Sequence, residues 1–269
     1  MNGNSASFKF NFFGNQGTQA QETVSSDSKR LNGEESKKNA CYVSTESAPI
    51  FEDFPCFPLN VANLSFIHYA GAIGGATDIV PGQFEGGHRI WQGCIDLLRY
   101  LEENPFPVNA STVVVELGCG HGLPGCYMLR KGARVYFQDY NEDSLEKATL
   151  PTIVVNCGVD AVNRAKLICA EWSQTAAMIP EPKVDLILAS DTIYTPATIR
   201  AFISVVNQIA TPETMVVIAS QRYYFGLGGG TQALNALIEE LHLPLRVEVL
   251  KTLGTDSVKR DIIRLIKCA

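Results

Sequence analysis

The sequence has few of the features that mark secreted, membrane-spanning or disulfide-bonded proteins. No apolar run approaches the length of a signal peptide or of a membrane span. The eight cysteines form no Cys-x-x-Cys pair, and most of them lie in apolar runs, where a free cysteine behaves as a small core residue. We therefore expect free thiols and a reducing compartment, the cytoplasm or the nucleus.

Missing features also restrict the ligands. The four histidines are scattered without the spacing of metal ligands, so we expect no metal site and interpret His88 and His121 as local hydrogen-bonding residues. The formal net charge is −6, and there is no run of Lys and Arg. Because neutralisation of phosphates dominates the affinity of proteins for nucleic acid, we expect no direct binding to RNA or DNA.

The chain divides into a polar tail and one large domain. Residues 1–50 are rich in Ser, Asn, Gln, Lys and Glu, and such a segment cannot bury enough apolar area to offset its ordering entropy. We predict a disordered tail over residues 1–50 and a folded domain over residues 51–269. Four aromatic residues interrupt the polar composition of the tail: Phe8, Phe10, Phe12 and Phe13. They either occur there by chance or form a short docking segment.

Apolar strands alternate with helical patterns through the domain. Strands are predicted over residues 112–117, 134–137, 165–169, 184–189, 214–219, 246–250 and 262–266. Helices are predicted over residues 87–103, 123–131, 141–155, 199–209 and 233–241, with a break at Pro151. The alternation predicts an α/β fold with a Rossmann-like, seven-stranded, mostly parallel sheet and helices on both faces. The last two strands are joined by a short connection, which predicts that the last strand is antiparallel.

A glycine-rich turn follows the first of these strands and opens a helix. Gly118, Gly120 and Gly122 would allow the sharp turn and the close approach of a ligand to the backbone. Gly120, Gly122 and Gly125 also fit the G-x-G-x-x-G pattern of dinucleotide sites, but this pattern alone is weak evidence. The turn therefore indicates a nucleotide-like cofactor without identifying it.

Two carboxylates bear on the choice of cofactor. Glu116 lies inside the strand, where a carboxylate is costly unless it is paired, and an acidic residue there favours S-adenosylmethionine over a dinucleotide. Asp139 ends the second strand, 21 residues beyond Gly118, where a carboxylate can accept hydrogen bonds from both ribose hydroxyls. Asp139 supports a nucleoside of either kind, and its alternative is a solvated strand end. We predict S-adenosylmethionine, with S-adenosylhomocysteine as the product.

Further candidates follow the third and fourth strands. Ligands of open α/β sheets bind beyond the carboxyl ends of the strands, which predicts that Ser190, Asp191 and Tyr194 lie near the reacting methyl group. Glu171 and Trp172 would flank the adenine, with a core aromatic as the alternative for Trp172.

The chain beyond residue 76 resembles the eukaryotic protein-histidine N-methyltransferases that modify a ribosomal large-subunit protein. The motifs that carry the resemblance are residues 78–87 (DIVPGQFEGG), 90–98 (IWQGCIDLL), 137–141 (FQDYN), 149–151 (TLP) and 223–230 (YYFGLGGG). The last of these is the most specific. Residues 8–12 (FKFNF) are also similar to the N-terminal segment of the family, which favours a function for the aromatic cluster.

The resemblance implies a set of cofactor contacts: Ile90, Trp91, Gln92, Gly93, Cys94, Gly118, Gln138, Asp139, Tyr140, Ala170, Glu171, Trp172 and Ser190. To these the glycine turn adds Glu116 and Gly120. Gln92 and Gly93 replace the usual Glu-Cys of the family, and Ala170 replaces a usual Gly. Asp191 replaces a usual Glu, which moves this motif toward the Asp-x-x-Tyr of related lysine methyltransferases.

These observations predict a protein methyltransferase that acts on histidine. Asp191 would stabilise the imidazolium that forms on methyl transfer, and Tyr194 would orient the acceptor. Glu85 is a weaker candidate for the carboxylate, with a solvated loop acid as the alternative. Residues 223–230 are expected to form a bare, mobile loop with flat aromatic walls that closes over a planar ring.

We expect a ribosomal large-subunit protein as the substrate, no membrane contact, and a monomer. Three alternatives remain: a lysine methyltransferase of the same superfamily, a non-catalytic binding module with the methyltransferase fold, and a dinucleotide oxidoreductase.

Overall fold

A computed structural model describes residues 39–45, 56–69, 86–255 and 258–268 of the chain. The aromatic cluster of the N-terminal segment and the candidate Glu85 lie outside these residues, and so does most of the motif at residues 78–87.

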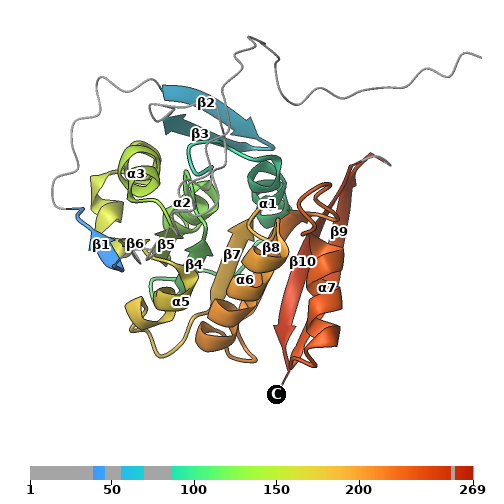
Figure 1. Ribbon diagram of the computed structural model, residues 1–269. Helices are drawn as coiled ribbons and strands as arrows, with labels where there is room; N and C mark the ends of the chain where they lie inside the picture. Colours follow the sequence, from blue (N-terminus) through green and yellow to red (C-terminus); the bar gives the residue numbers. More distant parts are fainter. Residues whose placement is uncertain (1–38, 46–55, 70–85, 256–257, 269) are drawn as a thin grey trace, which may run out of the picture. The chain divides into compact units, whose positions relative to one another are not determined.

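The centre of the domain is an eight-stranded mixed sheet, with the strand order β1-β6-β5-β4-β7-β8-β10-β9 (Figure 1). Its strands are β1 Cys41–Val43, β4 Val113–Leu117, β5 Arg134–Asp139, β6 Ala165–Cys169, β7 Leu186–Ser190, β8 Met215–Gln221, β9 Leu245–Gly254 and β10 Lys259–Lys267. Strands β4 to β8 pair in parallel, whereas β10 is antiparallel to both of its neighbours. The predicted α/β fold with an antiparallel last strand is therefore confirmed.

Helices cover both faces of the sheet and create two apolar cores. One face carries α1 Gln92–Glu103, α2 Leu123–Arg130 and α4 Leu150–Cys157, and the other carries α5 Trp172–Thr175, α6 Pro196–Ile209 and α7 Thr231–Glu240. Alternate residues of the strands point into the two cores. In β4, for example, Val114 belongs to the first core, and Val113 and Val115 belong to the second. Because both faces of the sheet are buried, the central strands are continuous apolar runs and do not alternate between apolar and polar residues.

One strand lies where the sequence predicted disorder. Cys41–Val43 form β1, which pairs antiparallel with the edge strand β6. The hydroxyl of Tyr42 donates a hydrogen bond to the carbonyl of Met178, and Val43 is buried. The prediction of a disordered tail is therefore wrong for residues 41–43, because pairing with a sheet edge supplies the backbone hydrogen bonds that a polar composition does not reveal.

Two predicted helices have different limits in the structure. Helix α1 begins at Gln92, not at residue 87, and the preceding Gly86 has a positive φ of 78°. The helix predicted over residues 141–155 is divided into α3 Glu142–Ser144, a π-helical turn Leu145–Thr149, and α4. Pro151 lies in the first turn of α4, where its missing N–H costs no hydrogen bond, so the change of helical register just before it accommodates the proline.

A hairpin that the sequence reading did not predict packs beside the sheet. Strands β2 Cys56–Val61 and β3 Leu64–Tyr69 pair antiparallel, and β3 packs on α4. The side chain of Asn156 accepts a hydrogen bond from the N–H of Ile67 at 2.8 Å and donates one to its carbonyl, as a paired strand would. The guanidinium of Arg130 lies 4.3 Å from the centre of the Phe66 ring and donates to the carbonyl of Ser65.

The topology fixes the place of a ligand. Strand β4 pairs with β5 on one side and with β7 on the other, so the strand order reverses there. Open α/β sheets bind ligands outside the carboxyl ends of their strands at such a point. The carboxyl ends of β4, β5, β6 and β7 carry most of the residues that the sequence marked.

Candidate active site

The glycine turn after β4 requires glycine at two positions. Gly118 and Gly120 have positive φ angles of 63° and 51°. A Cβ atom on Gly118 would lie 2.7 Å from the methyl group of Thr192, and one on Gly120 would lie 2.9 Å from the carbonyl oxygen of Gly87. Both the backbone conformation and the lack of space therefore exclude larger residues.

Asp139 ends β5 with a buried carboxylate that the backbone holds. Its Oδ2 accepts a hydrogen bond from the N–H of Gly120 at 3.0 Å, and its Oδ1 accepts one from the N–H of Asn141 at 3.0 Å. The carboxylate therefore ties the end of β5 to the glycine turn. An ionised carboxylate offers about four acceptor positions, so one carboxylate can bind several donors at once.

Gln138 connects the ends of three strands. Its Oε1 accepts from the N–H of Gly118 at 3.1 Å and from the indole N–H of Trp172 at 2.7 Å, and its Nε2 donates to the carbonyl of Ala170 at 2.7 Å. The ring of Trp172 also packs edge-to-face on Phe202, with 5.6 Å between ring centres. Trp172 therefore has the contacts of a core aromatic along one side while it remains attached to the site through Gln138.

Glu116 lies below the turn and not in its opening. It is buried, and its Oε2 accepts a hydrogen bond from the N–H of Gly125 in α2 at 2.8 Å. Burial raises the pKa of Glu116 to about 8, although the Gly125 hydrogen bond acts in the opposite direction. Near pH 7 this side chain is mainly a neutral acid that links β4 to the helix after the turn.

The segment before α1 approaches the same strand ends. The indole N–H of Trp91 donates to the carbonyl of Gly86 at 3.2 Å, and the guanidinium of Arg89 lies 4.8 Å from the Trp91 ring centre. Within the helix, the side chain of Gln92 donates to Asp96 at 3.1 Å, and Asp96 also forms an ion pair with Arg260 of β10. These contacts fix the first turn of α1 against the sheet.

The remaining predicted contacts lie in or beside α1, β5 and α5. Ile90 and Tyr140 are half-buried beside the turn, and Cys94 is buried in α1. Glu171 precedes α5, and its carbonyl accepts a hydrogen bond from the hydroxyl of Thr175 at 3.0 Å.

Asp191 is held by contacts that span much of the chain. It follows β7 with a positive φ of 52°, which is uncommon for a residue other than glycine. Its Oδ2 accepts from the N–H of Gly93 at the start of α1 at 2.7 Å, and its Oδ1 accepts from the hydroxyl of Tyr224. Burial raises the pKa of Asp191, and the hydrogen bonds from Tyr224 and Gly93 act against that shift.

Gly93 is explained by the same contact. A Cβ atom at this position would lie 2.4 Å from Oδ2 of Asp191, so only glycine lets the carboxylate reach the start of the helix. A carboxylate in this place also interacts favourably with the positive end of the helix dipole.

The sequence analysis did not predict that Tyr224 holds Asp191. It was expected to be one wall of an aromatic slot, but its ring is buried and its hydroxyl donates to Asp191. Burial and the charge of Asp191 raise the pKa of Tyr224, so it remains a donor across the physiological range. The ring of Tyr194 lies edge-on to it, with 6.5 Å between ring centres. In the sequence, this role was indicated only by the position of a tyrosine, which carries a hydroxyl, beside the glycine-rich segment.

The loop that contains Tyr224 is not bare. The N–H of Tyr224 donates to the carbonyl of Gly229 at 3.0 Å, and the N–H of Gly230 donates to the carbonyl of Ile193 at 2.8 Å. A Cβ on Gly229 would lie 2.2 Å from the backbone of Tyr194. The prediction of a bare backbone is therefore wrong, because the glycines serve to pack the loop against residues 193–194.

Two hydroxyls near the turn have unusual surroundings. The hydroxyls of Thr192 and Ser144 are buried, and within the described residues neither has a hydrogen-bond partner. Thr192 touches Gly118, and Ser144 lies against Gly87 beside Asp139. Buried polar atoms are normally satisfied, so a polar ligand at the turn would fit them.

The structure thus brings the predicted residues into two groups. The first contains the glycine turn, Gln138, Asp139 and the Trp172 segment at the ends of β4, β5 and β6. The second contains Ser190 and Asp191 at the end of β7, with Tyr194 after them. His121 lies in the turn, where its ring packs edge-on to His68 of the hairpin at 5.3 Å, and His88 is buried before α1. Among the described residues, no cluster of three or more His, Cys, Asp or Glu residues could hold a metal ion.

Comparisons with known proteins place this geometry in context. A family model described as lysine methyltransferase matches residues 82–225. The histidine protein methyltransferase 1 homolog of Dictyostelium discoideum is 37% identical over 166 residues, which cover 62% of this chain and 53% of that protein. The homolog of the same name from Bos taurus is 32% identical over 191 residues, which cover 61% of this chain and 51% of that protein.

A more distant relative has another acceptor in its name. The protein N-lysine methyltransferase METTL21A of Xenopus tropicalis is 24% identical over 135 residues, which cover 50% of this chain and 60% of that protein. The chain spans about half the length of the two histidine methyltransferase relatives. In the part of the chain that the structure describes, no helix is long and apolar enough to cross a membrane.

Proposed function

Because the chain belongs to the lysine methyltransferase family, whose model matches more than half of it, we propose that it is an S-adenosylmethionine-dependent protein-histidine N-methyltransferase. The substrate that we propose is a ribosomal large-subunit protein. Relatives named for histidine methylation support the acceptor, and the motif at residues 223–230 supports the ribosomal substrate through its family resemblance. The free cysteines of the described residues are consistent with a reducing location in the cytoplasm or the nucleus.

The ends of β4 to β6 would hold the cofactor. Asp139 would accept hydrogen bonds from the ribose hydroxyls, and the turn from Gly118 to Gly120 leaves room for close approach to the backbone. The buried hydroxyls of Thr192 and Ser144 would gain partners from a polar ligand at this place. S-adenosylmethionine, when bound, supplies an electrophilic methyl group on a sulfonium.

Asp191 and Tyr194 would act on the acceptor. A histidine must arrive as a neutral imidazole whose attacking nitrogen carries no proton, and its ring becomes cationic after methylation. The carboxylate of Asp191 would stabilise that charge, because it is preorganised by Gly93 and Tyr224 in a largely water-excluded site. Tyr194 would orient the ring, and alignment of the nitrogen with the methyl group would supply most of the acceleration.

The observation that carries the proposal is the juxtaposition of Asp191 with the glycine turn. Thr192, the next residue, touches Gly118. The carboxylate that would stabilise the acceptor therefore lies beside the glycine turn that would bind the nucleoside of the cofactor. Cell extract that lacks this protein should therefore become labelled when the purified chain and methyl-labelled S-adenosylmethionine are added. The labelled band should be a ribosomal protein, and its labelling should fail when the target histidine is replaced by alanine. Labelling that persists in that variant would exclude histidine as the acceptor.

Lysine methylation is the second candidate, and specific observations favour it. The family model and the amphibian relative carry lysine in their names. By the family resemblance, Asp191 also replaces a usual Glu of the histidine methyltransferases. A non-catalytic module is the third. Calorimetry with S-adenosylmethionine tests that alternative, since a module without a cofactor site would give no binding heat.

A further inference from the structure

The loop after β8 has two chemically different sides. Tyr224 is only 8% exposed, whereas its neighbours Tyr223 and Phe225 are 41% and 76% exposed, and Leu227 is 48% exposed. We call the three exposed side chains, Tyr223, Phe225 and Leu227, the apolar lip. The same loop therefore directs one aromatic residue toward Asp191 and presents the others to solvent.

The lip is held in place by its backbone. The N–H of Arg222, just before it, donates to the carbonyl of Lys259 at 2.9 Å, and the N–H groups of Leu227 and Gly228 donate to the carbonyl of Tyr224 at 3.1 and 3.0 Å. The rings of Tyr223 and Phe225 pack edge-to-face with 5.0 Å between their centres. The hydrogen bonds of this loop hold large apolar side chains at the surface, where they do not contribute to the core. Exposed apolar patches of this kind mark interaction sites.

The charge next to the lip is already neutralised. Arg222 donates two hydrogen bonds to Asp261, at 2.9 and 2.7 Å, and another to the hydroxyl of Thr252. Asp261 is buried, and these hydrogen bonds hold its pKa below the usual range despite the opposing effect of burial. The lip therefore offers apolar contact and not ionic contact.

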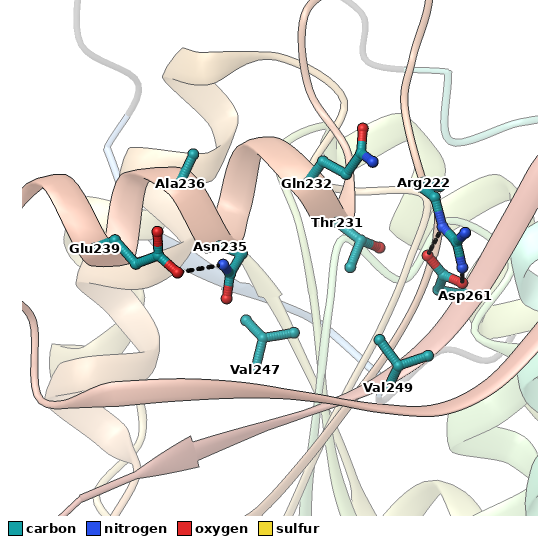
Figure 2. A pocket seen from close by; sticks show the side chains of 9 residues that line it. All are labelled: Arg222, Thr231, Gln232, Asn235, Ala236, Glu239, Val247, Val249 and Asp261. Atoms are coloured by element: carbon teal, nitrogen blue, oxygen red, sulfur yellow. Dashed lines mark hydrogen bonds and ion pairs between the residues drawn. The ribbon is translucent and has the colours of Figure 1, made fainter.

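A groove begins at Arg222, the residue before the lip, and follows α7. It has a volume of about 340 Å³ and lies between α7 and the edge strand β9. Figure 2 shows Val247 and Val249 of β9 pointing toward the helix, with the Arg222–Asp261 pair at one end of the groove. Gln232, which also lines the groove, donates from its backbone N–H to the carbonyl of Arg222. Arg222, which lines one end of the groove, directly precedes the lip in the chain.

The hydrogen bond between Tyr224 and Asp191 indicates which partner this surface would bind. Tyr224, in the middle of the lip, bonds directly to the carboxylate that would face the acceptor. Resting on the proposed function, we propose that the lip and the groove are the docking surface for the substrate polypeptide, and that the lip binds apolar side chains next to the acceptor residue. A polypeptide that presents one side chain to Asp191 would lay its neighbouring residues on Tyr223 and Phe225.

The test compares two double variants with wild type. The probe is protein extracted from large ribosomal subunits of cells that lack this chain, and the readouts are KM and kcat for methyl transfer. Tyr223→Ala with Phe225→Ala should raise KM about tenfold, since buried aromatic anchors are typical hot spots. Tyr223→Leu with Phe225→Leu keeps apolar contact and should stay within about threefold of wild type on the same scale. Affinity for S-adenosylmethionine, measured by calorimetry, should be equal in all three proteins.

The matched control is Val159→Ala, which truncates a side chain that is 63% exposed outside the lip and the groove. Its KM should equal that of wild type. The KM ratio between the alanine double variant and wild type should also persist from about 50 to 300 mM salt, because apolar contacts are not screened. An unchanged KM in that variant, or a ratio that vanishes with salt, would overturn the docking surface alone. A wild-type chain that binds cofactor but methylates no protein would overturn the proposed function, and the docking surface with it.

Discussion

Asp139 and Asp191 both lie at the carboxyl end of a parallel strand with a carboxylate that accepts hydrogen bonds, yet the donors differ. Asp139 is held by the backbone N–H groups of Gly120 and Asn141. Asp191 is held by the N–H of Gly93, 98 residues away, and by the hydroxyl of Tyr224, 33 residues away. In the proposed cofactor half, at the ends of β4 to β6, the carboxylate has backbone N–H donors. In the proposed acceptor half, at the end of β7, the carboxylate also depends on a side chain from a separate loop.

This difference teaches where specificity can change. Backbone donors do not depend on the identity of a side chain, so these contacts of Asp139 persist as long as the glycine turn keeps its conformation. A side-chain donor such as Tyr224 can be altered by one substitution, and the carboxylate that it holds will then move. We infer that the choice of acceptor is adjusted in the β7–β8 half while the β4–β6 half stays the same.

The largest expected effect is on the free energy of unfolding, and it tests the burial of Glu116 beneath the glycine turn. The pKa of Glu116 is raised to about 8 from 4.5, so the folded protein keeps a proton that the unfolded chain releases. Stability from this group is complete below about pH 4.5 and is lost as the pH rises to about 8, by up to about 4 kcal/mol. Glu116→Gln should flatten that decline in urea unfolding between pH 5 and 8. Parallel pH profiles for the two proteins would refute the buried neutral acid.

Asp139→Ala should break the cofactor half. Loss of a charged acceptor for the ribose should weaken cofactor binding by about 2–4 kcal/mol, and the two backbone N–H groups left without an acceptor should also lower stability by about 1–3 kcal/mol. Asp139→Asn is the matched control, because it keeps one acceptor oxygen and should recover part of the stability without the affinity. Calorimetry that finds equal affinity in all three proteins would remove the ribose assignment.

Asp191→Asn should lower the rate of methyl transfer without weakening the binding of the cofactor. The charge matters only as the acceptor becomes cationic, so kcat should fall about tenfold to a hundredfold, the equivalent of one charged hydrogen bond. The dissociation constant of the cofactor should change less than twofold, since Asp191 belongs to the other half. A fully active variant would show that the negative charge is not needed.

That Gly118, Gly120 and Asp139 lie together could be predicted from the sequence, because they are close together in the chain. Gly118, Gly120 and Asp139 belong to one strand–turn–helix–strand unit, and the apolar runs around them predict the strands. The family resemblance is confirmed by the family model and by relatives named histidine protein methyltransferase, and membership of a methyltransferase family removes the dinucleotide oxidoreductase.

The acceptor half could not be read in the same way. That Tyr224 turns inward while Phe225 turns outward depends on the backbone path of one loop, and periodicity carries no information about it. Strand β1 was missed for a related reason, since it pairs with a distant sheet edge. The β2–β3 hairpin pairs locally, but it also depends on Asn156, 89 residues from Ile67. Contacts of this kind are properties of the assembled fold.

The smallest expected effect concerns the edge of the cofactor half. We propose that residues 1–38 are dispensable for folding and that β1 is part of the domain. Deletion of residues 1–38 should leave the melting temperature unchanged, whereas deletion of residues 1–45 should lower it by roughly 3–5 °C, because β6 loses its edge partner and Val43 loses its burial. Equal melting temperatures for the two deletions would remove β1 from the stabilising contacts.

Identification of the methylated amino acid tests the central claim most directly. The purified chain would label protein from large ribosomal subunits with tritiated S-adenosylmethionine, and the labelled protein would be hydrolysed to free amino acids and separated by chromatography. We predict that the radioactivity elutes with methylhistidine and that Asp191→Asn greatly reduces it. Radioactivity that elutes with methyllysine would contradict the account.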